Sequence, residues 1–148
     1  MLLVLFQLQD DAYAIDSAKV IEVIPFLMTQ KIPMTPKFIT GMVNYRGNPV
    51  PVIDLGLLLN EKPCRQQLST RIILISVSVG QKFKKIIGLL AENVTETIKT
   101  PKEWYPTKPT TDQGPSFLDS TITRHPMLRW FDPEQILPED IPGLSFLE

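Results

Sequence analysis

The side chains that could do chemistry in this sequence are few and scattered. There is one histidine, His125, in a predicted turn, and one cysteine, Cys64. Adjacent acids occur at residues 10–11 and 139–140, in contexts typical of a turn and a tail, without further ligands at the spacing of a metal site. No nucleophile is paired with a base, and no phosphate loop, dinucleotide fingerprint or nucleophile elbow occurs. The sequence therefore predicts a protein that is not an enzyme and has no cofactor or metal site.

Composition indicates a folded protein and argues against nucleic acid as a partner. The 148 residues, 43% hydrophobic and 21% charged, are enough for one ordinary domain or two small barrels that share a core. The net charge is −1, whereas nucleic-acid binding calls for a clustered basic face. The basic cluster of Lys82, Lys84 and Lys85 is interpreted as a solvated strand edge, where lysine discourages edge-to-edge aggregation.

The cysteine content and the first residues indicate a compartment. With Cys64 alone, no intrachain disulfide can form, which fits a reducing environment. Residues 1–8 are apolar, but they lack a basic region and a small-residue cleavage site and are too short to span a bilayer. We therefore expect a cytoplasmic protein with no direct membrane insertion.

What remains is a lone arginine, Arg46, in a predicted β-hairpin over residues 41–54. Residues 47–48, glycine and asparagine, tolerate positive φ and predict a two-residue turn that leaves Arg46 at the hairpin tip. Its planar guanidinium suits a carboxylate or the carbonyls of a partner protein. The alternative is an intramolecular ion pair with Glu22 or Asp54. Both can hold, because an internally braced arginine is better organised for a partner.

Short strands are expected to position these side chains. Alternating or β-branched apolar runs bounded by turn residues predict them over residues 2–9, 12–16, 20–24, 71–79, 83–90, 117–123 and 127–131.

Helical turns and loops separate the strands. Single helical turns are expected at residues 17–19, 36–39 and near residue 91, and the first of them would be capped by Asp16 or Ser17. Asp54 and Asp132 are expected to cap short helices. Residues 60–70 are predicted to form a polar linker and residues 100–116 a long proline-rich loop.

The two halves of the chain resemble each other. Residues 14–24 align without gaps on residues 88–98, and Asp54 matches Asp132. This order predicts a tandem duplication with a period of roughly 75 residues. Each unit would supply about five strands, enough for a small closed barrel with too little core to stand alone. We therefore predict a mainly β fold of two packed five-stranded barrels. The side chains expected inside are Leu5, Phe6, Ile15, Val23, Val43, Val52, Ile73, Ile75, Leu89 and Ile122.

Five segments of the first half resemble the CheW family of chemotaxis adaptor proteins. In chain order, they are Tyr13-Ala14-Ile15-Asp16, Lys19-Val20-Ile21-Glu22-Val23, Pro36-Lys37-Phe38-Ile39-Thr40-Gly41, Asn44-Tyr45-Arg46-Gly47 and Val50-Pro51-Val52-Ile53-Asp54-Leu55. Their spacing matches the family pattern from Tyr13 to Leu55 without an insertion or a deletion. The resemblance implies one domain over residues 1–148, made of two intertwined SH3-like barrels, with the repeats at about residues 1–60 and 71–138.

The resemblance also implies a function and a set of partner-binding residues. A CheW-like protein couples the regulatory domain of a CheA-type histidine kinase to the cytoplasmic tip of a methyl-accepting chemoreceptor, in an array for chemotaxis or twitching motility. Arg46 would lie in the receptor-facing region, and Val20, Glu22 and Gly41 near the kinase-facing surface. Tyr45, which replaces the leucine usual in the family, is the fifth residue expected at a partner.

Departures in the second half fit a divergent member, such as one that serves a pilus-type array. Ala91-Glu92 replaces valine-aspartate, Ser120 replaces a glycine, and residues 129–130 interrupt an expected aliphatic strand. The alternative function is a small-ligand-binding barrel without catalytic activity. Trp104 and Tyr105 of the proline-rich loop would then close a pocket, whereas the competing interpretation is that they pack this loop onto the barrels.

Overall fold

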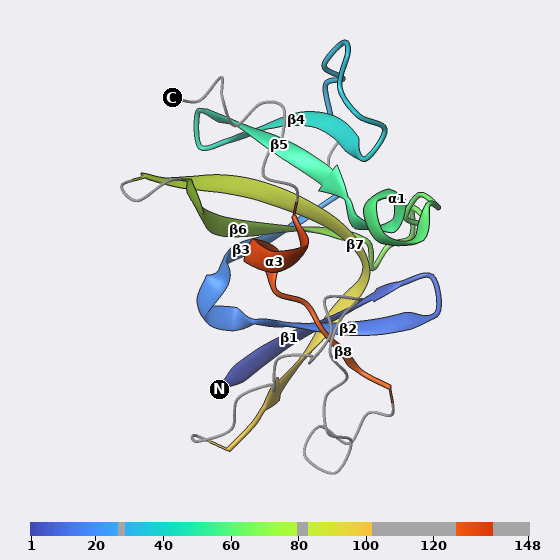
Figure 1. Ribbon diagram of the computed structural model, residues 1–148, viewed down its shortest axis with the longest axis vertical. Coiled ribbons are helices and arrows are strands. Elements are labelled where there is room, and N and C mark those ends of the chain that lie inside the picture. The colour runs from blue at the N-terminus through green and yellow to red at the C-terminus, as the bar shows by residue number, and fades with distance from the viewer. Residues whose placement is uncertain (27–28, 80–82, 102–126, 138–148) are drawn as a thin grey trace.

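The computed structural model describes residues 1–26, 29–79, 83–101 and 127–137 (Figure 1). The predicted mainly β class is confirmed. The described elements are, in chain order, β1 (Leu2–Leu8), β2 (Asp11–Asp16), the 3-10 helix η1 (Ser17–Lys19), β3 (Val20–Pro25), β4 (Ile39–Tyr45), β5 (Asn48–Asp54), α1 (Leu55–Asn60), β6 (Arg71–Val79), β7 (Phe83–Lys99), β8 (Arg129–Trp130) and α3 (Pro133–Ile136).

Strand β7, 17 residues long, connects two groups of strands. Its first part pairs antiparallel with β6 and parallel with β5, while β4 extends the group beyond β5 and β3 extends it beyond β6. Its last part pairs antiparallel with β1, followed by β2 and the short parallel strand β8. We call these the first and second strand groups, and Figure 1 shows β7 curving from one into the other.

Each group therefore draws strands from both halves of the sequence. The first half supplies β1 and β2 to the second group but β3, β4 and β5 to the first. Two parallel contacts have the same form, since β5 lies along β7 and leads into α1, while β8 lies along β2 and leads towards α3. The tandem duplication itself stays a prediction.

Side chains of β1 alternate between two hydrophobic clusters. Val4, Phe6 and Leu8 belong to the large cluster, and Leu3 and Leu5 to a smaller one. Burial on both faces explains the uninterrupted apolar run at the start of the chain, because successive side chains of a strand point to opposite faces.

Most of the residues predicted for the core are buried. These are Leu5, Phe6, Ile15, Val43, Val52, Ile73, Ile75 and Leu89. The prediction was wrong for Val23, which is 38% exposed. The reason is that β3 is an edge strand of the described sheet and alternation buries the neighbouring Ile24 instead. Ile122 lies outside the described residues.

Local capping predictions are confirmed. The Asp16 carboxylate accepts from the backbone N–H of Ala18 at the start of η1. Asp54 caps α1 and Asp132 caps α3 in the same way. These caps could be found from sequence because each depends on neighbours within three residues.

Two helical turns that the sequence predicts are absent from the structure. No helical turn occurs near Ala91, because β7 continues through this position. Ala91 pairs with β6 and Glu92 pairs with β1, and this long-range pairing overrides the local signal. Residues 36–39 form one hydrogen-bonded turn rather than a helical turn. The predicted strand at 117–123, the loop at 102–116, and Lys82, Trp104, Tyr105, Ser120 and His125 lie outside the described residues.

In the part of the chain that the structure describes, no helix has both the length and the apolar character needed to cross a bilayer.

Candidate partner-binding surface

Three of the five predicted site residues form one cluster at the surface. The Tyr45 hydroxyl donates a hydrogen bond of 2.5 Å to Oε2 of Glu22. Nη2 of Arg46 lies 3.7 Å from the same oxygen, and the Arg46 guanidinium carbon lies 5.2 Å from the centre of the Tyr45 ring. We call Glu22, Tyr45 and Arg46 the Glu22 cluster. It joins β3 to the hairpin of β4 and β5.

The hairpin turn differs by one residue from the prediction. Its two central residues are Arg46 and Gly47, with φ of 51° and 84°, because Asn48 already pairs with Tyr45. Two positive φ values are typical of the type I′ turn, which matches the twist of the strands. The side chain of Asn44 accepts from the N–H of Gly47 and supports the turn at 2.8 Å. The turn holds Arg46 close to the Tyr45 ring, a cation–π arrangement.

Arg46 is braced and still exposed. Its side chain is 76% exposed, and that of Glu22 is 43% exposed. An exposed pair of this kind contributes little to stability, but it restricts the rotamers of the arginine. Of the two intramolecular partners considered, the structure selects Glu22. Asp54 is buried and accepts from the N–H groups of Leu57 and Cys64 instead.

The hydrogen bond raises the pKa of the Tyr45 hydroxyl. The main cause is that the Glu22 carboxylate accepts a hydrogen bond from the protonated hydroxyl, and some desolvation acts in the same direction. The nearby positive charge of Arg46 opposes the shift. Tyr45 is therefore a neutral donor at physiological pH, and Glu22 remains available to Arg46 as an acceptor.

Apolar side chains lie beside Glu22 on the edge strand β3. Ile21 is 45% exposed and Val23 38% exposed, and Val20 is half-buried against the main core. An exposed apolar patch next to charged groups is typical of a protein docking surface. Val20 and Glu22, two of the predicted site residues, both lie on β3.

Gly41 is buried and does not lie in the Glu22 cluster. Its φ is +145°, and a Cβ atom there would lie 2.3 Å from the carbonyl oxygen of Gln30. Gln30 forms a bridge with Met42, so the chain crosses closely over this position. The structure thus gives the glycine a backbone role, and its expected contribution to a kinase-facing surface stays a prediction.

Sequence reasoning missed a second polar cluster, at the junction of the two strand groups. The carboxylate of Glu92 is fully buried and forms a 2.6 Å ion pair with Nε of Arg65. It also accepts from the backbone N–H groups of Gln9 and Arg65. One signal was available, because Glu92 is an acid directly after the apolar run at 86–91, most of which falls in the strand predicted at 83–90.

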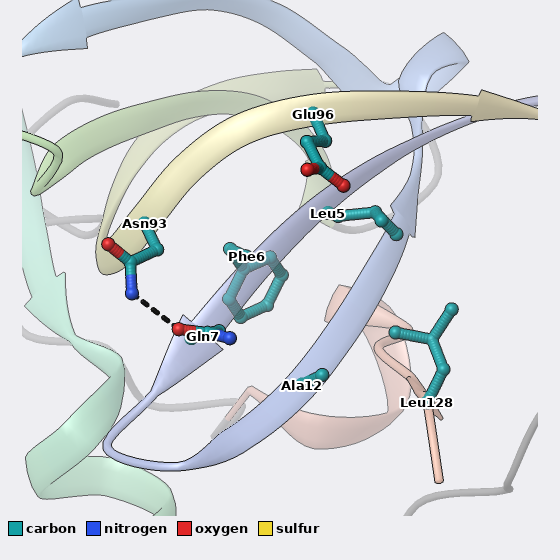
Figure 2. Close-up of a pocket in the computed structure, with 7 residues that line it drawn as sticks. All are labelled: Leu5, Phe6, Gln7, Ala12, Asn93, Glu96 and Leu128. Atoms are coloured by element: carbon teal, nitrogen blue, oxygen red, sulfur yellow. Dashed lines mark hydrogen bonds between the residues drawn. The ribbon is translucent and has the colours of Figure 1, made fainter. Parts of the chain in front are cut away.

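A pocket of about 290 Å³ lies in the second strand group, apart from the Glu22 cluster. Its lining residues are Leu5, Phe6, Gln7, Ala12, Asn93, Glu96 and Leu128, and Figure 2 shows the amide of Asn93 bonded to Gln7 at one side. Across the described ranges, no group of three or more histidine, cysteine or acidic side chains gathers as metal ligands would.

Fold and surface together define a mainly β scaffold that presents a braced arginine beside an exposed apolar strand. The chain belongs to the CheW-like domain family, whose model matches residues 2–140. It is similar to the scaffolding protein TtCheW from Thermoanaerobacter tengcongensis, with a TM-score of 0.67, 28% identity, and coverage of 88% of this chain and 83% of that chain. The expected SH3-like barrels are consistent with this fold.

Curated relatives carry related names. The chain is 29% identical over 94 residues to "Chemotaxis protein CheW" of Helicobacter pylori, covering 64% of this chain and 54% of that protein. It is 29% identical over 99 residues to the protein of the same name in Klebsiella aerogenes, covering 67% and 57%. It is 30% identical over 89 residues to "Protein FrzA" of Myxococcus xanthus, covering 60% and 52%. The chain thus spans little more than half the length of these relatives.

Proposed function

We propose that this protein is an adaptor that couples the regulatory domain of a CheA-type histidine kinase to the cytoplasmic tip of a methyl-accepting chemoreceptor. Membership of the CheW-like family and the similarity to a scaffolding protein support the proposal. The same role would serve a flagellar array or a twitching array. The observation that carries it is the Glu22 cluster, in which Arg46 and Glu22, expected at different partners, meet on one exposed surface.

The proposed mechanism is positional and involves no bond breaking. Two partners docked on one stiff body have a raised effective concentration and a fixed mutual geometry. A receptor that changes state can then shift the balance between kinase conformations, because its contacts favour one of them. Bracing of Arg46 by Glu22 and Tyr45 limits the conformational entropy that the arginine loses when it binds.

Charge reversal at Arg46 tests the proposal. We expect Arg46→Glu to lose binding to a chemoreceptor-tip fragment, retain binding to the kinase regulatory domain and keep the wild-type melting temperature. Lys37→Glu is the matched control, since it reverses another exposed positive charge. Calorimetry with the two purified fragments measures both affinities. If the wild-type protein binds neither fragment, the adaptor role is contradicted.

A further inference from the structure

Strand β7 changes its partners at a single residue, Glu92. Up to Ala91 the strand pairs with β6, and from Glu92 onwards it pairs with β1. The register with β1 shifts at the same place, between Leu5 and Gln7, and Asn93 has a φ of 47°. An irregularity of this kind bends a strand and increases its twist. The junction of the two strand groups is therefore a bulge within one continuous strand.

Residues 62–70, which link α1 to β6, cross this bulge, and we call them the strap. From the strap, Arg65 donates to Glu92 through both its backbone N–H and Nε, and its Nη2 donates to the carbonyl oxygen of Gln9 at 2.9 Å. The N–H of Gln9 donates to the Glu92 carboxylate at 3.1 Å. The β1–β2 turn, the strap and β7 are thus joined through one fully buried carboxylate.

A second set of contacts joins the strap to the other side of the bulge. The hydroxyl of Ser69 donates to Oδ1 of Asn93 at 2.5 Å, and the N–H of Val94 donates to the carbonyl oxygen of Ser69 at 3.2 Å. The amide of Asn93 in turn donates to the side chain of Gln7 on β1. The residues predicted as a simple polar linker therefore hold both sides of the bulge.

We infer that Arg65 and Glu92 are positioning residues that fix the angle between the two strand groups, and with it the relative orientation of the surfaces that each group presents. Removing the guanidinium would leave a buried carboxylate without its ion-pair partner, which favours any rearrangement that lets water reach it. The ladder between β1 and β7 is already interrupted at the bulge, so such a rearrangement breaks few strand hydrogen bonds there. The consequence for partner geometry rests on the proposed function.

The angle can be measured without any partner. Spin labels at Asn48→Cys and Lys99→Cys report on the first and second strand groups, since both positions are exposed. Native Cys64 is buried and burial raises its thiol pKa, so it should stay unlabelled. Double electron–electron resonance between the two labels should give one narrow distance distribution in the parent protein and a shifted or broadened one in Arg65→Met. Lys62→Met, which removes another strap cation, should leave the distribution unchanged.

An unchanged distribution in Arg65→Met would overturn the inference. If that variant does not fold, Arg65→Lys and Ser69→Ala take its place. A broader distribution in either of them supports the strap, and parental distributions in both overturn it. These outcomes do not depend on whether the protein is an adaptor.

A second readout connects the angle to bridging. Arg65→Met should bind the kinase domain and the receptor-tip fragment separately as the parent does, while assembling the three-component complex at least about fivefold less well. Parental assembly together with an altered distance would reject the link to bridging and leave the angular role standing. If the parent protein binds neither fragment, the proposed function is rejected, while the inference about the angle still stands or falls on the distance measurement.

Discussion

The hydroxyl of Tyr45 donates a 2.5 Å hydrogen bond to the carboxylate of Glu22, which lies 23 residues earlier in the chain. Their strands do not pair with each other within the described sheet, since β3 pairs with β6 and β4 pairs with β5. This side-chain bond therefore connects two surface regions that are expected to face different partners. A change at one of the two residues should be felt at the other.

The pKa of Tyr45 should respond to the charge at residue 22. We expect Glu22→Gln to lower the pKa of Tyr45 towards its ordinary value, because an amide oxygen accepts the phenolic proton without a negative charge. Ultraviolet titration of the tyrosinate band measures the shift, and Tyr45→Phe identifies which titration belongs to this residue. An unchanged tyrosine titration in Glu22→Gln would show that the bond does not persist in solution.

The same shift gives a pH dependence of stability. The folded pKa of Tyr45 is raised above the unfolded value of about 10. The contribution of the bond is therefore fully present below pH 10 and is lost as the pH rises through the folded pKa. Parent and Tyr45→Phe should therefore differ in free energy of unfolding at neutral pH and converge in strongly alkaline solution. A difference that stays constant with pH would contradict this assignment.

Arg46 should matter little for stability. We expect Arg46→Ala to change the free energy of unfolding by less than about 0.5 kcal/mol, because both members of its ion pair are exposed to solvent. Urea denaturation of the parent and the variant measures the difference. A loss above about 2 kcal/mol would place Arg46 in the structural framework and would weaken any argument from its effect on partner binding.

The two helix caps should differ in their importance. Asp54 is 4% exposed and its Oδ1 accepts from the N–H groups of Leu57 and Cys64, so Asp54→Ala should cost about 3 kcal/mol. Asp132, with a side chain that is 23% exposed, bonds Glu134 N–H and Lys19, and Asp132→Ala should cost about 1 kcal/mol. Urea denaturation ranks them, and Asp54→Asn, which keeps an oxygen acceptor, should recover part of the loss. Equal costs would contradict the role of burial.

The sequence predicts what neighbouring residues determine and misses what distant pairing determines. The caps at Asp54 and Asp132 act over a few residues and were found correctly. The turn at Arg46 was displaced by one residue, because its register depends on where β5 begins to pair. Glu92 gave no sign of its partner, since Arg65 lies 27 residues away across the fold. The Glu22–Arg46 contact was one of two alternatives, and only the arrangement of β3 beside the hairpin decides between them.

The two positive-φ glycines of the hairpin should respond differently to a methyl group. At Gly41 an added Cβ would lie 2.3 Å from the backbone oxygen of Gln30, and φ is +145°, so Gly41→Ala should cost about 3 kcal/mol in free energy of unfolding. At Gly47 an added Cβ would have no heavy atom within 4 Å apart from those of its chain neighbours. Gly47→Ala should therefore cost only the energy of the left-handed backbone, about 1 kcal/mol. Urea denaturation compares the two.

The comparison also separates two roles for Gly41. If this residue acts only through the backbone, Gly41→Ala should weaken kinase-domain binding no more than the rise in its unfolded fraction explains, because the position is buried beneath Gln30. Calorimetry at a temperature where the variant stays folded measures this affinity. A large loss of binding by the folded variant would instead assign Gly41 to the kinase-facing surface, through a shift in the backbone that presents it.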